Sequence, residues 1–365
     1  MTAKPQTLDT RTLNRTLLAR QWLLERRQAP IVEAIDWLNG LQAQEARPPF
    51  IALWSRLQAF RREALLGALA DRSVVKATFT RGTLHLVSAG DYVAFRSTHA
   101  LMLEAAMRPE MSEITKVVPI ADVVAAGRAA LEAGPLAFAD LQTVLAERWP
   151  GLNGRHLAYA VRLNLPLVAM PHDGPWGGKA GGAFALADRW LGRAPDPKAD
   201  VEGLVRRYLE AFGPATVADI QTFTAMKSLK AVVDGMALAA YRNEAGKTLY
   251  DVKDGPVADG GTPAPARFVA DFDGIMLGHA DRARVIAEED RKRLWNQNLR
   301  VPAVFLVDGF AAGSWSLTAS KTKAVLTATP FGTLTKAAKD DLTAEGEALL
   351  RFLAPEAKTV EVVFA

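Results

Sequence analysis

The chain has 365 residues, of which 49% are apolar and 23% charged, as expected of a soluble globular protein with two or three packed units. It contains no cysteine, which excludes disulfides, thiolate metal sites and a cysteine nucleophile. Residues 1–100 hold 14 Lys and Arg against 8 Asp and Glu, and 12 of those cations are arginines. Arginine makes bidentate contacts with phosphate, so a nucleic acid is a candidate partner, although a solvated basic surface fits the same counts.

The composition also bears on location and cofactors. No apolar run approaches 18 residues, so we expect no membrane span. The start, MTAKPQTLDTRTLNR, lacks the apolar stretch of a signal peptide, so we expect a cytoplasmic protein. We also expect no metal and no other cofactor, because the histidines are scattered without ligand spacing: His85, His99, His156, His172 and His279.

The first hundred residues predict helices followed by a hairpin. Apolar periodicity places the helices over about residues 10–27, 31–38, 49–57 and 61–70. Asp9 or Thr10 is the candidate N-cap of the first, and Asn39-Gly40 ends the second. Two β-rich runs follow, SVVKATF and TLHLV, and the turn Thr80-Arg81-Gly82 between them predicts a β-hairpin.

The same order recurs twice. A second unit has predicted helices over residues 137–149 and 151–165 and strands over 167–172 and 183–188. A third, after the linker GRAPDPKAD, has predicted helices over residues 201–213, 214–226 and 227–236 and strands over 237–243 and 248–254. Helices followed by a hairpin are typical of the winged helix. We therefore expect three tandem winged-helix units over residues 1–110, 111–195 and 196–255.

Residues 256–365 differ from this pattern. A connector rich in Gly, Pro and Ala precedes the predicted strands AVFLV, FAAGSWSL and KAVLTATP, a helix over about residues 334–353 and a last strand, TVEVVFA. We expect a small α+β extension packed on the third unit. The expected fold class is thus mainly α with small β-hairpins (α+β).

Two glutamines two residues apart stand out in GLQAQEARPPF, residues 40–50. In an α-helix Gln42 and Gln44 would point roughly 200° apart, whereas an extended segment puts both amides on one side. Gly40 before them and Pro48-Pro49 after them favour the extended segment. Spacing alone, however, favours two solvated loop glutamines.

Five stretches together resemble the AlkZ-like (YcaQ-like) family of winged-helix DNA glycosylases. In the order usual for that family they are LNGLQAQEARPPFIALWSRL, TRGTLHLVSAGDY, FGPATVADIQTFTAM, DFDGIMLGHADRARVI and VFLVDGFAAGSWSL. The resemblance implies three tandem winged helices in a concave, C-shaped molecule that holds duplex DNA. It also implies excision of N7-alkylated purines and, in some members, of bulky or crosslinked adducts made by genotoxic natural products.

The family's catalytic signature is glutamine, one apolar residue, then aspartate or glutamine, which maps onto Gln42-Ala43-Gln44. The resemblance therefore assigns Gln42 and Gln44 as catalytic, although Gln44 cannot take a proton as an aspartate could. An N7-alkylated guanine is already positively charged, so amide dipoles that place a water and support a cationic sugar can suffice. We expect a monofunctional bacterial enzyme that leaves an abasic site, in a self-resistance or bulky-adduct role. Lys76 is the lysine that the fold could bring near the motif.

Further residues are candidate DNA contacts, each with an ordinary structural or solvent-exposed role as the alternative: Arg47, Arg81, Arg155, Lys179, His279, Arg282 and Arg284. His279 and Arg282 fall on positions that the family usually keeps. Gly278 stands where a serine is common, and VADFD lacks the glutamate that often precedes Phe-Asp. We expect Asp273 in that stretch to be structural.

The partner expected from the resemblance is duplex DNA carrying alkylated purines, bound by a monomer, with no membrane and no metal involved. An alternative from another class is a non-catalytic winged-helix DNA-binding protein, either a transcriptional regulator or a damage binder. Tandem winged helices and a basic first unit serve binding as well as catalysis.

Overall fold

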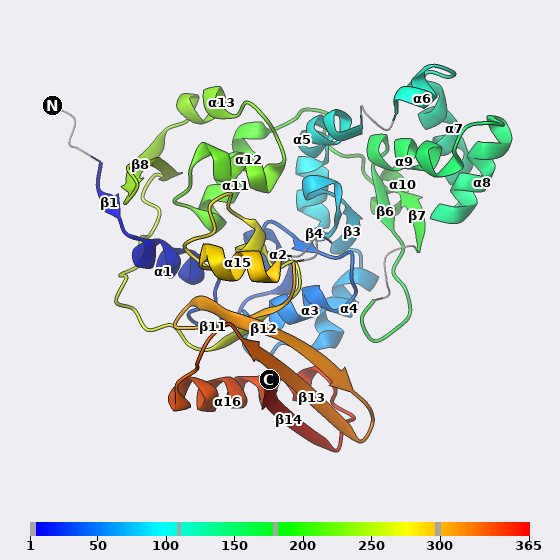
Figure 1. The fold of residues 1–365 in the computed structure, drawn as a ribbon. Helices are drawn as coiled ribbons and strands as arrows, with labels where there is room; N and C mark the ends of the chain where they lie inside the picture. The colour runs from blue at the N-terminus through cyan, green and yellow to red at the C-terminus, as the bar shows by residue number, and fades with distance from the viewer. Residues whose placement is uncertain (1–4, 108–110, 178–181, 296–300) are drawn as a thin grey trace.

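The computed structural model describes residues 5–107, 111–177, 182–295 and 301–365 (Figure 1). Over these residues the fold is mixed α+β, with three separate sheets. No helix within these ranges is long and apolar enough to cross a membrane.

The first unit lies in the middle of the molecule in Figure 1. Its elements are α2 (Ile31–Trp37), β2 (Leu41–Gln42), α3 (Pro48–Trp54), α4 (Arg62–Ala70), β3 (Val74–Thr78), the 3₁₀ turn η1 (Thr80–Gly82) and β4 (Leu84–Ser88). Strand β2 pairs antiparallel with β4, which in turn pairs with β3. The order is helix, short strand, two helices and hairpin, with the short strand added to the hairpin.

Two later units repeat that order. The second comprises α7 (Ile120–Glu132), β5 (Leu136–Ala137), α8 (Phe138–Arg148), α9 (Gly154–Asn164), β6 (Leu167–Ala169) and β7 (Ala183–Leu186), with β5 paired to β7. The third comprises α11 (Val201–Phe212), α12 (Val217–Thr224), α13 (Lys230–Gly235), β8 (Leu238–Asn243) and β9 (Thr248–Val252). Here a single bridge between Ala215 and Tyr250 takes the place of the short strand.

Sheets connect the units. The first and second hairpins form one six-stranded sheet, in the order β2-β4-β3-β6-β7-β5, through pairing of β3 with β6. The third hairpin pairs with β1 (Thr7–Leu8) instead. The links between the units are α5 (Ala89–Met107), α6 (Ser112–Thr115) and α10 (Ala187–Leu191).

The C-terminal part forms its own sheet at the bottom of Figure 1, in the order β10-β11-β12-β13-β14. Its strands are β10 (Arg267–Val269), β11 (Val304–Val307), β12 (Phe310–Ala319), β13 (Lys323–Pro330) and β14 (Thr359–Phe364). Its helices are α14 (Gly274–Leu277), α15 (Glu288–Leu294) and α16 (Lys336–Leu353). Helix α16 buries Leu342 and Leu349 in an apolar cluster that also contains Ile51 of α3. The C-terminal part therefore packs against the first unit.

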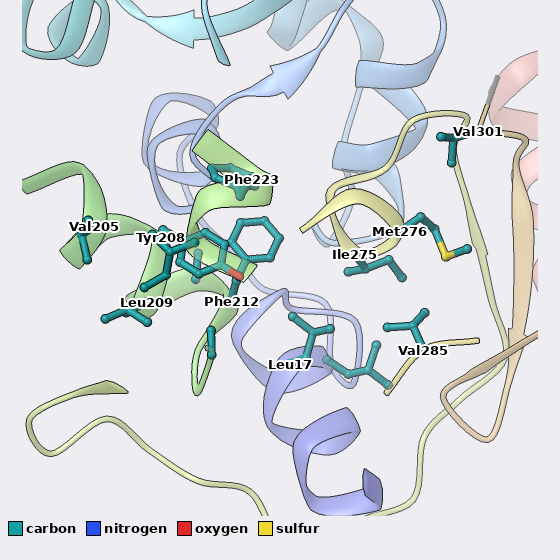
Figure 2. Close-up of a cluster of buried hydrophobic side chains, with 14 of the residues drawn as sticks. Leu17, Val205, Tyr208, Leu209, Phe212, Phe223, Ile275, Met276, Val285 and Val301 are labelled. Carbon is teal, nitrogen blue, oxygen red and sulfur yellow. The ribbon is translucent and has the colours of Figure 1, made fainter. Parts of the chain in front are cut away.

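A central apolar cluster joins parts that are far apart in the sequence. Figure 2 shows Leu17 from the N-terminal helix α1 (Thr10–Arg20) near Phe212 of α11 and Ile275 of α14. Fully burying side chains of this size stabilises the fold by about 1.5–3 kcal/mol each relative to leaving them exposed. The cluster therefore fixes α1, the third unit and the segment after β10 relative to one another.

Most predicted helices and hairpins are confirmed to within a few residues, but the first helix is shorter than predicted. Asp9 caps it as expected, accepting a hydrogen bond from the Thr12 amide, yet it ends at Arg20 rather than Arg27. At Trp22 the backbone turns to a φ of 55°. The Trp22 ring is buried and stacks 6.1 Å from that of Trp37, so tertiary packing ends a helix that apolar periodicity would have continued. Helices α5, α6, α7, α10, α14 and α15 were not predicted.

Candidate active site

Gln42 ends the short extended strand β2, and Gln44 lies in the bend that follows it. Asn39 and Gly40 take positive φ values of 58° and 83° and turn the chain from α2 into β2. A Cβ at Gly40 would come within 2.8 Å of a Val87 methyl carbon, so the turn requires glycine. Gln42 Nε2 donates a hydrogen bond to Gln44 Oε1 at 3.2 Å. The two amides are therefore on the same side, and they touch.

Arg81, at the tip of the first hairpin, orients this pair. Its Nη2 donates to Gln42 Oε1 at 3.0 Å, and its Nη1 donates to the carbonyl oxygen of Phe223 at 3.3 Å. With its oxygen held by Arg81, the Gln42 amide must present its NH₂ group to Gln44. Burial, and next the charge of Arg282, lower the pKa of Arg81 to about 10, so Arg81 remains cationic at neutral pH.

His85 lies directly opposite Gln42 in the register of β2 and β4. Its Nδ1 donates to the carbonyl oxygen of Thr83 at 3.1 Å. Burial, and next the charge of Arg81, lower the pKa of His85 to about 3. The ring is therefore neutral at physiological pH. To transfer a proton during catalysis, it would have to become protonated at a pH far above its pKa, which is unfavourable.

A cavity of about 30 Å³ opens beside Gln42, between the first unit and the turn before α14. Arg81, His85, Phe223 and Asp271 are among its lining residues. This volume has room for one or two water molecules, given polar partners, and not for a purine base. A small molecule held here would meet the Gln42 amide.

A buried ion pair forms another part of the cavity wall. Arg56 donates to the two carboxylate oxygens of Asp273 at 2.8 and 2.9 Å, and Asp273 also accepts from the Ile275 amide at 3.1 Å. The structural role predicted for Asp273 is confirmed. Its partner Arg56 was not predicted, because the two residues are 217 positions apart and no local pattern connects them.

The register of the shared sheet places Lys76 on the face opposite to that of Gln42. Lys76 pairs with Leu86, which pairs with Leu41, whereas Gln42 shares its row with His85 and Ala77. Paired residues point to the same face of a sheet and neighbours along a strand to opposite faces. The Lys76 side chain therefore projects from the face of the sheet opposite to that of Gln42. Its pKa is lowered by burial, an effect that Glu45 opposes.

Besides Arg81, four of the residues predicted to contact DNA differ in their surroundings. Arg282 is close enough to Arg81 to lower its pKa, and its guanidinium carbon lies 5.0 Å from the Trp295 ring centre. Arg47 is exposed, 5.8 Å from the ring centre of Trp176. Arg155 is exposed at the start of α9 in the second unit. Lys179 lies outside the described residues.

His279 and Arg284 are interior residues with only 1% and 6% of their surfaces exposed. His279 Nε2 lies 3.0 Å from the carbonyl oxygen of Phe212, and Arg284 Nη1 donates to that of Pro214 at 2.9 Å. Burial, and next the charge of Arg284, lower the pKa of His279 to about 3. These two side chains join the segment before α15 to the third unit and are almost fully buried. The expectation that they contact DNA stays a prediction.

No group of three or more His, Asp or Glu side chains that could hold a metal ion occurs within the described ranges. The two amides and Arg81 are joined by hydrogen bonds, and Arg282 lies close enough to Arg81 to lower its pKa. These residues come from β2 and the loop before α3, from the first hairpin and from the segment before α15. The sequence predicted that Gln42 and Gln44 lie on one side of the segment, but no local pattern indicated that Arg81 and Arg282 lie near them.

Comparisons with known proteins extend this picture. The family model of AlkZ-like DNA glycosylases matches residues 35–352. A curated relative, the interstrand DNA cross-link repair glycosylase of Streptomyces sahachiroi, is 25% identical over 352 residues, covering 86% of this chain and 88% of the relative. The solved structure of the Streptomyces sahachiroi DNA glycosylase AlkZ matches with a TM-score of 0.80 over 99% of this chain and 100% of that one, at 21% identity.

The structural likeness shows a shared fold, and the family match extends over most of the chain, including Gln42, Gln44, Arg81 and Arg282. The family match also favours the enzyme over the non-catalytic DNA-binding protein, the two alternatives that the sequence left open. The chain belongs to the family of AlkZ-like DNA glycosylases and is an enzyme that hydrolyses N-glycosidic bonds.

Proposed function

We propose that this enzyme is a monofunctional glycosylase that removes N7-alkylated purines from duplex DNA and leaves an abasic site. The observation that carries the proposal is the Gln42–Gln44 amide pair, oriented by Arg81 beside a cavity of water size. Because the curated relative is named for interstrand cross-link repair, we include bulky and crosslinked purines among the substrates. The double-glutamine motif then serves resistance to such adducts.

The substrate supplies the driving force for bond cleavage. Alkylation at N7 places a positive charge on the purine, and the electron pair of the breaking C1′–N9 bond neutralises that charge. The sugar becomes oxocarbenium-like, and the carbonyl dipoles of Gln42 and Gln44 stabilise it without titrating. A water held by the amides adds to C1′ and releases its proton to solvent, which yields the abasic site.

The surroundings of the amides support this division of labour. His85 is neutral and donates to Thr83, and the carboxylate of Asp273 is engaged by Arg56. Neither is arranged as a general base beside the pair. Because the amides supply no proton to the leaving base, we expect undamaged purines, which carry no charge, to be excised poorly. The position of Lys76 on the opposite face of the sheet supports a monofunctional enzyme.

We assign the DNA contacts to the exposed arginines Arg47 and Arg155, to Arg81, which lines the small cavity, and to the half-buried Arg282. Guanidinium groups bind phosphate in bidentate geometry, and such contacts position the duplex without reading its sequence. The threefold repeat of a helix, a short strand or single bridge, two helices and a hairpin supports three winged-helix units, and we propose that they bind DNA as a monomer. The divisions at residues 110, 195 and 255 remain our proposal.

A gel assay tests the proposal. A duplex with one N7-methylguanine is incubated with purified enzyme, then treated with alkali to cleave abasic sites; the expected result is a single cut at the lesion. Without alkali the strand should remain intact, and borohydride should trap no covalent complex. The same duplex with unmodified guanine is the control. An uncut wild-type reaction would contradict the substrate, and full activity of Gln42→Ala plus Gln44→Ala would contradict the catalytic assignment.

A further inference from the structure

A larger groove borders the small cavity beside Gln42, and no step of the proposed reaction uses it. It has a volume of about 730 Å³, and we call it the Trp176 groove, defined by Glu45, Arg47, Asp173, Trp176, Asp271 and Trp315. Pro48 and Asp271 line both this groove and the small cavity beside Gln42, so the two hollows are neighbours. Its size falls within the range of pockets that bind small organic groups.

The aromatic walls of the groove are held in place. The Trp176 ring packs edge-on against Phe50, with ring centres 5.1 Å apart. The Trp315 indole Nε1 donates to the carbonyl oxygen of Val269 at 3.0 Å. Aliphatic side chains, Leu317 and Leu353 among them, complete the lining. The groove is therefore largely apolar and formed in advance of binding, so little ordering is needed to occupy it.

The charge of the groove is opposite to that of the DNA-contacting surface. Glu45, Asp173 and Asp271 contribute three carboxylates to the lining, against the guanidinium of Arg47 and the exposed ring of His172, and the Arg62 guanidinium lies against Trp176. The carboxylates outnumber the two guanidinium groups, so away from Arg47, which we assign to DNA, the groove favours a cation over a phosphate. Trp176 shows the same preference, because the guanidinium carbons of Arg62 and Arg47 lie 5.0 and 5.8 Å from its ring centre.

We propose that the Trp176 groove binds a cationic, largely apolar substituent carried on N7 of the purine, and so makes the enzyme prefer adducts that bear an amine. This inference rests on the proposed function. One ring carbon separates N7 from the glycosidic nitrogen, so a substituent on N7 begins close to the reacting C1′. Glu45 directly follows Gln44 in the chain, which places the groove at a matching position beside the amides.

The test uses duplexes with one of three lesions: N7-methylguanine, an N7-guanine adduct with an aryl-alkylamine tail, and its isostere with a hydroxyl in place of the amine. The wild-type kcat/KM should be about fivefold higher for the amine tail than for the hydroxyl tail, the scale of one or two exposed ion pairs. Glu45→Gln plus Asp173→Asn should remove that preference and leave excision of N7-methylguanine unchanged.

The matched control is Asp341→Asn plus Glu347→Gln on α16, which removes the same charge from two residues outside the groove. It should retain the preference, and a loss there would overturn the inference in favour of net charge. Equal rates on both tails, with N7-methylguanine still excised, would overturn the inference alone. Failure on N7-methylguanine itself would contradict the proposed function. Circular dichroism melting confirms that both double variants are folded.

Discussion

The first and second units have the same order of elements, and their short strands lie at opposite ends of one sheet. Strand β2 is Leu41–Gln42 and β5 is Leu136–Ala137, so a glutamine in one unit corresponds to an alanine in the other. Helix α8 begins immediately after β5, whereas residues 43–47 separate β2 from α3. That inserted loop carries Gln44 and Arg47. The repeated fold is a scaffold, and the residues that we propose as catalytic lie in only one of these two units.

The residues that pair with Gln42 and Ala137 on the neighbouring strands also differ in polarity. Gln42 faces His85 in β4, whereas Ala137 faces Ala183 in β7. The first hairpin turns tightly, so that Arg81 at its tip reaches back to Gln42. A polar strand, an inserted loop and a tight hairpin together distinguish the unit that we expect to cleave from the unit that we expect only to bind.

The largest expected effect comes from exchanging the corresponding residues. Gln42→Ala should lower kcat on N7-methylguanine about 10²–10³-fold, the effect of losing one preorganised dipole. Because β2 pairs with β4 through its backbone, the free energy of unfolding should change by less than about 1 kcal/mol. Ala137→Gln in β5 is the matched change and should leave kcat unaltered. Similar losses in both variants, measured by single-turnover kinetics, would break the comparison.

Arg81 should have the next largest effect. Arg81→Ala frees the Gln42 amide to rotate and removes a cation, so kcat should fall about tenfold and DNA affinity about threefold. Arg81→Lys restores the charge but not the planar fork, so it should recover affinity and not kcat. Single-turnover rates and filter-binding Kd values separate the two. Equal recovery of both quantities by lysine would mean that Arg81 acts as a charge alone.

His85 should be visible in the pH dependence of stability. Its pKa is lowered by burial to about 3 in the folded state and is near 6.5 unfolded, so acid favours the unfolded chain. The stability is fully present above pH 6.5 and is lost as pH falls towards 3, by up to about 1.4 kcal/mol per pH unit for this group. Urea unfolding at several pH values should show a shallower loss below pH 6 in His85→Gln. An identical slope in the two proteins would contradict the burial of a neutral His85.

The smallest effect is expected in the second unit. Arg155→Ala on α9 should remove one phosphate contact, weaken DNA binding about threefold and lower the slope of log Kd against log salt by about one. Its kcat should be unchanged, because no reacting group lies in that unit. Arg351→Ala, an exposed arginine on α16, serves as the matched control. A fall in kcat for Arg155→Ala would show that the second unit contributes more than binding.

The sequence by itself determined the local features of this protein. Apolar periodicity, the Asp9 cap and the Thr80-Arg81-Gly82 turn predicted most helices and the first hairpin, because those preferences act within a few residues. Gly40 and the prolines likewise predicted the extended segment that puts Gln42 and Gln44 side by side, which their hydrogen bond confirms. The resemblance then gave that segment a function.

Only the tertiary structure decided which distant residues meet. The end of the first helix at Arg20, the pairing of Arg56 with Asp273 and the burial of His279 and Arg284 all depend on contacts between segments far apart in the chain. So do the placement of Arg81 on Gln42 and of Lys76 on the far face of the sheet. The physical reason is that burial and sheet register are fixed by the packing of the whole chain, and no local pattern of residues encodes them.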